Sequence, residues 1–445
     1  MSEAVLALVR GALPAPAPPG ADSLLIRGER VLAVATEAAV RAEAGPGARV
    51  VDLGGRQVGP GFHDAHFHFL QSGIFAARPD LRPCRDRDEV LAAVEGAHRD
   101  RPGAELLLLE NYDETGWPEP RAPTRRELDR IDPNRPLVLR RVDGHTAVAN
   151  SAGAARLAAY APEDVDPETG RCRERAVLEL DERFPPARDE IRDAFAAAAA
   201  RCFAVGITTT CDFLRRGACA QYADAFPGGP DVPDLDLYLW PECGAEDIAR
   251  LPLSGALRHR GIKLFADGSV GARAAAMFAG YADRPEERGI LFYEDHALHR
   301  EIRRGHDAGF QVAVHAIGDR AIAQVVAAFA ALPREEIRDR GHRIEHFELP
   351  REEEIRAVAA IGVRPCVQPN FVGNWSGPGG LYETALGSDR LRAMNPFRRL
   401  LDLETGVFFG SDGMPASPRY GIRSAMRHPV REQRLTEAEA TRLYT

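Results

Sequence analysis

The pattern of this sequence changes at the stretch Pro60-Gly61-Phe62-His63-Asp64-Ala65-His66-Phe67-His68. Before it, short β-rich runs are separated by turns. After it, short apolar or β-branched runs alternate with helix-like stretches. Such an alternation is typical of β-α-β units that build a parallel sheet, either closed into a barrel or doubly wound. The length of the chain and the number of repeats favour a distorted eight-stranded TIM (β/α)8 barrel, an α/β fold.

The elements expected after residue 61 follow from this alternation. Strands are predicted at Leu106–Leu109, Leu137–Leu139, Ile207–Cys211, Leu235–Trp240, Ile262–Phe265, Val312–Val314, Arg343–Ile344, Val363–Val367 and Val407–Phe409. Helices are predicted at Asp86–Arg99, Arg188–Ala204, Asp295–Ala308, Arg320–Ala331, Arg351–Ala360 and Thr436–Leu443.

Three segments depart from the simple alternation. Residues 1–58 are predicted to form a small β subdomain of the sandwich type. Residues 59–445 form the predicted barrel, and within it residues 70–187, rich in Pro, Arg and Asp, are interpreted as an insertion after the first barrel strand that forms a lid. Residues Asn370–Arg392 are expected to be a long active-site loop. The β runs of the small subdomain are Ser23–Ile26, Arg30–Val34 and Arg49–Leu53.

The composition excludes several classes of protein. Hydrophobic residues make up 44% of the 445 residues and charged residues 28%, which is typical of a globular protein rather than a disordered one. The net charge of −9 offers no electrostatic attraction to nucleic acid or an anionic membrane. No apolar run approaches the roughly 20 residues needed to span a bilayer. We therefore expect neither a nucleic-acid partner nor a membrane partner.

The N-terminus and the cysteines favour a cytoplasmic location. Met1–Arg10 lacks a basic segment, and its apolar stretch is too short for a signal peptide. The seven cysteines are odd in number and contain no CxxC pair. This pattern predicts reduced thiols rather than a disulfide framework or a cysteine zinc site.

His66 and His68 lie two residues apart at the end of the first predicted barrel strand. The two-residue period of a strand places both imidazoles on one face. Two neutral imidazoles on one face are the beginning of a site for zinc or a similar metal. A single pair of histidines is weak evidence for a metal site, because structural histidines, buried or on the surface, explain most such pairs.

Four further residues of ligand type lie at or just beyond the carboxyl ends of later apolar runs. They are Lys263, His315, His346 and Asp412. In a barrel, the carboxyl ends of all strands open on the same face, where active sites are built. The sequence therefore predicts that these side chains converge with His66 and His68 on one rim.

Lys263 is the only lysine among the 57 lysine and arginine residues. A coding bias toward arginine explains the general replacement of lysine, but it does not explain why one lysine remains. Arginine cannot lose its proton in a protein, whereas a lysine amine can, and the neutral amine is then reactive. The alternative is a leftover surface charge, and the neighbouring ligand-type residues argue against it.

The motifs resemble those of the amidohydrolase superfamily, more closely the branch that contains N-substituted formamide deformylase and YtcJ-like proteins (the amidohydrolase 3 type). The resemblance runs from about residue 23 to the end of the chain. The matching segments are Pro60–His68, Pro123–His145, Lys263–Ser269, His315–Arg320, Arg343–His346, Gln368–Asn370 and Gly410–Asp412. So many matches in the same order make the resemblance to the family specific, although they do not identify a substrate.

The resemblance implies a role for each of these residues. His66 and His68 would bind a more buried metal, and His315 and His346 a second one. Lys263 would be carboxylated and bridge the two metals, and Asp412 would contact the first metal and transfer protons. The metal is expected to be zinc, with two ions per chain, although some members of the superfamily keep only one. A carbamate suits the bridge because its two oxygens can hold two cations, and arginine cannot form it.

The expected activity is hydrolysis of a C–N bond, other than a peptide bond, in an amide, formamide or cyclic amide. The metals would lower the pKa of a bound water. Asp412 would take the proton and pass it to the leaving amine. The same site could instead act on a lactone, a phosphoester or a ring amidine, as a deaminase does. A truncated, non-catalytic binding protein is a further alternative, and the complete ligand set argues against it.

Candidate substrate-binding residues are His145, Gln368, Asn370 and Trp117. Each also has a structural interpretation. A glycine-flanked histidine in a loop is as often structural, Pro369 can mark a plain turn, and aromatic residues in loops often pack locally.

The expected partner is a small-molecule substrate, and the sequence leaves a homo-oligomer open. Relatives usually continue beyond the last barrel helix with strands that complete the small β-sandwich. This chain stops at Tyr444-Thr445, so the sandwich is expected to be incomplete at its C-terminal end.

Overall fold

The computed structural model describes residues 4–14, 17–102, 105–142, 144 and 146–445, and it contains two compact units. The first unit ends at Gly61 and also includes Thr445. The second unit is Phe62–Tyr444. The sequence predicts a first subdomain that ends at residue 58, and the structure divides the chain slightly later, after Gly61.

The first unit consists, in its described residues, of one mixed sheet and one helix. The sheet has the strand order β3-β2-β1-β4. Its elements are β1 (Val5–Val9), β2 (Ser23–Arg27), β3 (Arg30–Ala35), α1 (Glu37–Ala44) and β4 (Arg49–Asp52). β1 was not predicted, because its apolar run at the start of the chain was considered only as part of a leader segment. β1 connects β2 to β4 within the sheet, since it pairs antiparallel with β2 and parallel with β4.

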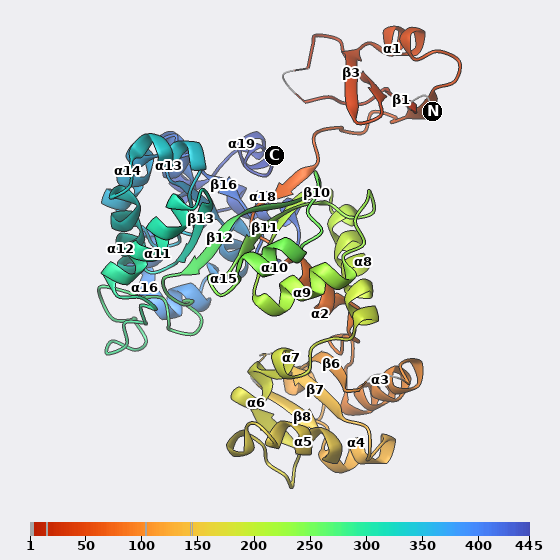
Figure 1. Cartoon of the computed structure of the whole chain (residues 1–445), viewed down its shortest axis with the longest axis vertical. Helices are drawn as coiled ribbons and strands as arrows, with labels where there is room; N and C mark the ends of the chain where they lie inside the picture. The colour runs from red at the N-terminus through yellow and green to blue at the C-terminus, as the bar shows by residue number, and fades with distance from the viewer. Residues whose placement is uncertain (1–3, 15–16, 103–104, 143, 145) are drawn as a thin grey trace. The chain divides into compact units, whose positions relative to one another are not determined.

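The second unit contains an eight-stranded, all-parallel sheet with the order β16-β15-β14-β13-β12-β11-β10-β5 (Figure 1). The strands are β5 (Phe62–Asp64), β10 (Ile207–Leu214), β11 (Asp234–Leu239), β12 (Leu257–Phe265), β13 (Gln311–Ala316), β14 (Arg343–His346), β15 (Arg364–Val367) and β16 (Phe408–Phe409). The two edges meet, because the amide of Ala65 donates to the carbonyl of Phe409 at 3.2 Å and that of Asp412 to the carbonyl of His66 at 2.7 Å. The sheet is therefore a nearly closed TIM barrel, as predicted.

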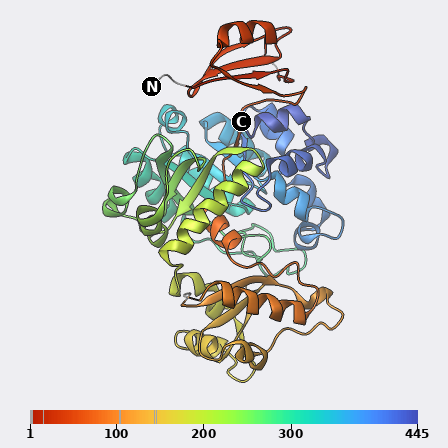
Figure 2. The same ribbon diagram turned by 90° about the vertical axis from the view of Figure 1, so that its right-hand side faces the viewer.

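Helices cover the outside of the barrel strands (Figures 1 and 2). They are α8 (Arg188–Ala204), α9 (Arg216–Ala225), α10 (Ala245–Arg250), α11 (Asp295–Asp307), α12 (Asp319–Ala330), α13 (Arg334–Arg340), α14 (Glu352–Ile361), α17 (Phe397–Asp402), α18 (Pro418–Met426), η3 (Arg431–Gln433) and α19 (Glu437–Arg442). Among the described residues, none of the helices is both long and apolar enough to cross a bilayer.

Local sequence signals set the ends of several of these helices. Thr436 and Glu439 form a reciprocal capping box at the start of α19, which satisfies amide groups that the first turn leaves open. α13 and α14 end at Gly341 and Gly362, which have φ values of 64° and 86°. Only glycine adopts this left-handed conformation without steric cost, so both helices stop there and the chain turns into the next strand.

Residues 70–187 form a second, smaller sheet with its own helices. The sheet has the order β6-β7-β8-β9, with β6 parallel to β7 and the other pairs antiparallel. Its strands are β6 (Leu107–Tyr112), β7 (Leu137–Arg141), β8 (Thr146–Ala149) and β9 (Arg171–Arg173). The helices before and within this region are α2 (Phe69–Ala77), α3 (Arg87–Asp100), η1 (Glu114–Gly116), α4 (Arg125–Ile131), α5 (Ser151–Ala158), η2 (Pro162–Asp164), α6 (Arg175–Leu178) and α7 (Leu180–Arg183).

The segment Asn370–Arg392 is not the long loop that the sequence predicted. It forms most of two helices, α15 (Pro369–Trp375) and α16 (Leu381–Ala393). Pro369 occupies the first turn of α15, where the lack of an amide proton costs nothing. The glycine-rich run that suggested a loop lies only between the helices, and Gly387, with a φ of 76°, interrupts α16.

We expect Gly73→Ala to destabilise the barrel unit. A Cβ atom at Gly73 in α2 would lie 2.0 Å from the carbonyl oxygen of Ala194 in α8, so the two helices would have to separate. Overpacking of this kind costs roughly 1–3 kcal/mol of unfolding free energy. Denaturant unfolding followed by circular dichroism measures the change.

Gly96→Ala in the interior of α3 is the matched control. The nearest atom to its added Cβ lies 3.9 Å away, on the flexible end of Arg99. Without a clash, replacing a helical glycine should stabilise the protein by about 0.5–1 kcal/mol. Equal effects of the two substitutions would show that the α2–α8 contact is looser than the structure indicates.

Candidate metal centre

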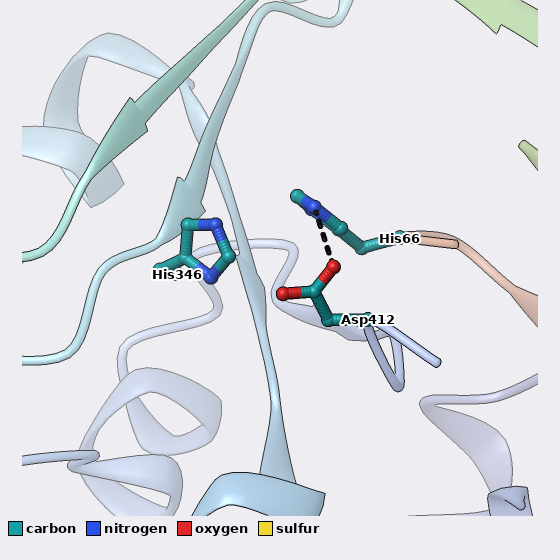
Figure 3. A group of neighbouring side chains, drawn as sticks. All are labelled: His66, His346 and Asp412. Carbon is teal, nitrogen blue, oxygen red and sulfur yellow. Dashed lines mark ion pairs between the residues drawn. The ribbon is translucent and has the colours of Figure 1, made fainter. Parts of the chain in front are cut away.

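His66, His68 and Asp412 meet at the carboxyl ends of the first and last barrel strands. His66 and His68 follow β5, and Asp412 follows β16. The Nε2 atoms of His66 and His68 lie 3.5 Å and 3.0 Å from Oδ1 of Asp412. Figure 3 shows the side chains of His66 and Asp412 pointing toward each other. The convergence predicted from the sequence is therefore present for these three side chains.

His346 and His315 complete the cluster from β14 and β13. The ring centroid of His346 lies 4.7 Å from that of His66 and 4.4 Å from that of His315. One ligand atom each of His66, His346 and Asp412 lie within 4.8 Å of one another, close enough to hold one ion (Figure 3). Strand register explains the approach, because His315 pairs directly with Glu345, the residue before His346.

A buried carboxylate fixes the orientation of His66. Oε2 of Glu345 lies 2.5 Å from Nδ1 of His66, and Glu345 has no exposed surface. The guanidinium of Arg343 donates to both carboxylate oxygens and to the carbonyl of Ala65. Because the carboxylate accepts the Nδ1 proton, Nε2 of His66 is left as the nitrogen with a lone pair. This is the arrangement that histidine ligands of metals require.

His346 is oriented in the same way by a neutral acceptor. Oε1 of Gln368 lies 2.8 Å from Nδ1 of His346, and Nε2 of Gln368 donates to the carbonyl of Cys366 at 3.3 Å. The second bond fixes which end of the amide faces the imidazole. His346 therefore donates through Nδ1 and keeps the lone pair of Nε2 for a ligand.

The charge states of His66, His315 and His346 suit a metal site. Burial, followed by the nearby charge of Lys263, lowers the pKa of His66 to about 4 and that of His315 to about 3. Burial also lowers the pKa of His346 well below its usual range. These imidazoles are neutral at pH 7, and a neutral imidazole is the form that binds a metal.

Lys263 is buried in the barrel without a hydrogen-bonding partner. Its side chain is 1% exposed, and Nζ has no partner among the described residues. Nζ lies 4.2 Å from the ring centroid of Phe213 and 4.8 Å from that of Phe265. Burial lowers the pKa of Lys263 to about 8, so the neutral amine is within reach near pH 7. A buried amine without a hydrogen-bonding partner, close to these imidazoles, fits the bridging group of a metal centre.

The backbone of the site holds three residues in a conformation that is costly for side chains other than glycine. The φ values are 72° for His346, 49° for Phe347 and 55° for Asp412. Such strain costs about 1–3 kcal/mol per residue and concentrates at functional sites. Two candidate ligands are therefore held in place at an energetic cost that the surrounding structure must offset.

A second cluster of ligand-type atoms comprises His66, Glu345 and Cys366. It is a poor metal site, because the guanidinium of Arg343 already occupies both oxygens of Glu345. Burial also raises the pKa of the Cys366 thiol well above its usual range, which opposes the thiolate form that metals bind. We interpret this cluster as support for His66.

Of the candidate substrate-binding residues, the structure describes Gln368, Asn370 and Trp117. Asn370 is fully buried and bonds to the carbonyl of Pro415 and the hydroxyl of Tyr444, which is a structural role. Trp117 packs in the apolar core beside β6 and β7 and donates to the carbonyl of Cys84. Gln368 contacts His346 rather than open space. His145 lies outside the described residues.

Two residues of the centre were not identified from the sequence. Arg343 and Glu345 stood in the quoted motif, but only His346 received a role. The period of two along β14 places Arg343 and Glu345 on the same face, and both are buried, so two charges in alternation on a short strand were the available signal. Asp64, the last residue of β5, accepts a hydrogen bond from the amide of Ser411 at 2.8 Å.

We expect Gln368→Leu to weaken metal binding with little loss of stability. The substitution removes the acceptor that orients His346, and losing such a partner typically lowers metal affinity about 10–100-fold. Competition with a chromophoric chelator measures the affinity. Gln324→Leu is the control, since Gln324 is also buried but donates to the carbonyl of Tyr293 and to Asp295 at the start of α11. Equal affinity losses in both variants would contradict the orienting role.

The chain is similar to several known proteins along most of its length. The chain is 29% identical over 435 residues to the amidohydrolase YtcJ of Bacillus subtilis, covering 90% of this chain and 80% of that protein. It is 27% identical over 469 residues to N-substituted formamide deformylase of Arthrobacter pascens, covering 96% and 85%. The crystal structure of an uncharacterised metal-dependent hydrolase from Pyrococcus furiosus matches with a TM-score of 0.84 at 28% identity, covering 99% and 93%.

A family model gives the assignment directly. The model described as the Amidohydrolase family matches residues 49–445, which includes every candidate ligand of the centre. The chain therefore belongs to the Amidohydrolase family.

Proposed function

We propose that this protein is a metal-dependent hydrolase that cleaves a C–N bond, other than a peptide bond, in an amide, formamide or cyclic amide. The observation that carries the proposal is the convergence of neutral imidazoles and the Asp412 carboxylate beside the unpartnered amine of Lys263. The match to N-substituted formamide deformylase supports this choice of bond. The expected partner is a small-molecule substrate, and the expected location is the cytoplasm.

The residues present fit a centre of two zinc ions. His66, His68 and Asp412 would hold one ion, and His315 and His346 the other. Carboxylation of Lys263 would supply the bridging anion, and it requires the neutral amine that burial favours. When bound, the metal would lower the pKa of water and so supply a nucleophile at neutral pH.

Asp412 is the residue proposed to move the proton. Burial alone would raise its pKa, but His66 and His68 outweigh burial, and the pKa of Asp412 lies below its usual value. The carboxylate is thus ionised at neutral pH and able to accept a proton from water. Its contact with His68, whose side chain is 40% exposed, supports a path for the proton toward the leaving nitrogen.

Substitution of Lys263 tests the bridging role. We expect Lys263→Ala to lower metal content and activity together, because the bridging anion is lost. Short carboxylic acids should partly restore both, since they can occupy the vacated space as an anion. Elemental analysis and rate assays on the same samples provide the measurement.

Lys263→Arg is the companion variant. It keeps the positive charge but cannot form a carbamate. We expect it to lose metal and activity as the alanine variant does, without rescue by carboxylic acids. Full metal content and activity in this variant would rule out the carbamate.

A substrate screen with an Asp412 control tests the reaction itself. The screen compares N-formyl amines, N-acyl amino acids and hydantoin-like rings with lactones, phosphoesters and ring amidines, in the presence of zinc. We expect turnover among the first three classes, and Asp412→Asn should lower kcat roughly 10²–10⁴-fold, as the loss of a proton-transfer group does.

The matched control is Asp389→Asn, because the Asp389 side chain is 95% exposed. This variant should retain full activity. Turnover confined to lactones, phosphoesters or amidines would overturn the proposed bond, and an unchanged kcat in Asp412→Asn would overturn the proton-transfer role.

A further inference from the structure

Two cysteines lie side by side at the carboxyl ends of adjacent barrel strands. Cys219 is in α9, which follows β10, and Cys243 is in the turn between β11 and α10. Their Sγ atoms are 3.7 Å apart. This is the same end of the barrel that carries the candidate metal centre, and the proposed function makes no use of either thiol.

The thiol pair differs in exposure and reactivity. Cys219 is 1% exposed, whereas Cys243 is half-buried and can meet a small reagent. The thiol of Cys219 donates to the sulfur of Cys243, and that hydrogen bond lowers the pKa of Cys243 in spite of burial and the neighbouring carboxylates of Glu242 and Asp247. The more accessible thiol is thus also the better nucleophile.

The geometry lets the two sulfurs reach bonding distance. A disulfide requires a separation of about 2.05 Å, so the sulfurs must approach each other by less than 2 Å. Residues 240–244 belong to no helix or strand, and this turn can supply the movement more easily than α9. Neither thiol belongs to a group of three ligand-type side chains among the described residues, so a structural metal does not explain the pair.

Aromatic contacts connect the pair to the candidate metal centre. The amide of Cys243 donates to the carbonyl of Trp240 at 2.9 Å. The ring centroid of Trp240 lies 4.5 Å from that of Phe265, and Phe265 stacks on His315 at 5.2 Å. A series of contacts through Trp240 and Phe265 therefore joins the turn to His315.

We propose that Cys219 and Cys243 form a reversible disulfide by exchange with a small-molecule disulfide such as oxidised glutathione. The Cys243 thiolate attacks one glutathione sulfur, and the S–S bond breaks to release the first glutathione, which takes up a proton. Cys219 loses its proton and attacks the Cys243 sulfur, releasing the second glutathione. The protein loses two electrons and two protons, and one glutathione disulfide becomes two thiols.

The sequence around the pair allows a direct test. Cleavage after arginine gives one peptide, 217–250, that contains both cysteines and none of the other five. The folded, metal-loaded protein is equilibrated in buffers with a rising ratio of oxidised to reduced glutathione. Free thiols are then alkylated, the protein is cleaved, and the mass of the peptide is measured by mass spectrometry. We expect most of the peptide to lose two hydrogen atoms. After a second cut at Tyr222, the fragment with Cys219 and the fragment with Cys243 should stay joined. Excess reduced glutathione should reverse the change.

Matched variants separate this exchange from general oxidation. Cys219→Ser and Cys243→Ser should each abolish the linked peptide, whereas Cys84→Ser, at another half-buried thiol, should leave it unchanged. Glutathione attached to Cys243 with Cys219 still reduced would overturn the proposal. Linkage only after denaturation, or linkage between two chains, would also overturn it. The mass measurement requires no substrate, so it tests the disulfide independently of the proposed hydrolysis.

Discussion

The geometry of the candidate metal centre depends on one buried carboxylate, Glu345. It accepts hydrogen bonds from Arg343 on its own strand and from His66 on the far side of the barrel seam. Removing one member of such a buried pair typically costs about 3–5 kcal/mol, because the other charge is left uncompensated. Arg343 also holds the carbonyl of Ala65, so the chain leading to His66 is fixed at both its backbone and its ring. The position of His66 is therefore set before any metal binds.

The two cationic side chains inside the barrel, Arg343 and Lys263, have different surroundings. Arg343 is neutralised by Glu345, whereas Lys263 faces aromatic rings and has no hydrogen-bonding partner in the described structure. Burial without a hydrogen-bonding partner disfavours the charged form of an amine, whereas a nearby anion stabilises it. The neutral amine is the form that the proposed carboxylation requires, and the carbamate would replace a buried positive charge by an anion.

The sequence was informative wherever chemistry coincides with the end of a strand. His66, His315, His346 and Asp412 each follow a short apolar run, and barrel topology alone predicts that they converge. The roles of Glu345 and Gln368 could not be predicted in the same way, because they depend on which ring nitrogen each oxygen meets across the barrel. The helices α15 and α16 were missed for a related reason. Their glycine-rich connection suggested a loop, while their apolar faces are recognised only once the partners in the core are known.

The buried position of Lys263 explains why the chain keeps a lysine there. Every other basic side chain apart from histidine is an arginine, so this protein has no general need for lysine. At position 263, however, an arginine would bring a larger group that keeps its charge at any accessible pH. Among the described residues, the group at this position has no hydrogen-bonding carboxylate of its own, since Glu345 already bonds to Arg343 and His66. Lysine is the basic residue that can occupy this place and become neutral, and the neutral amine is the form that the proposed bridging role requires.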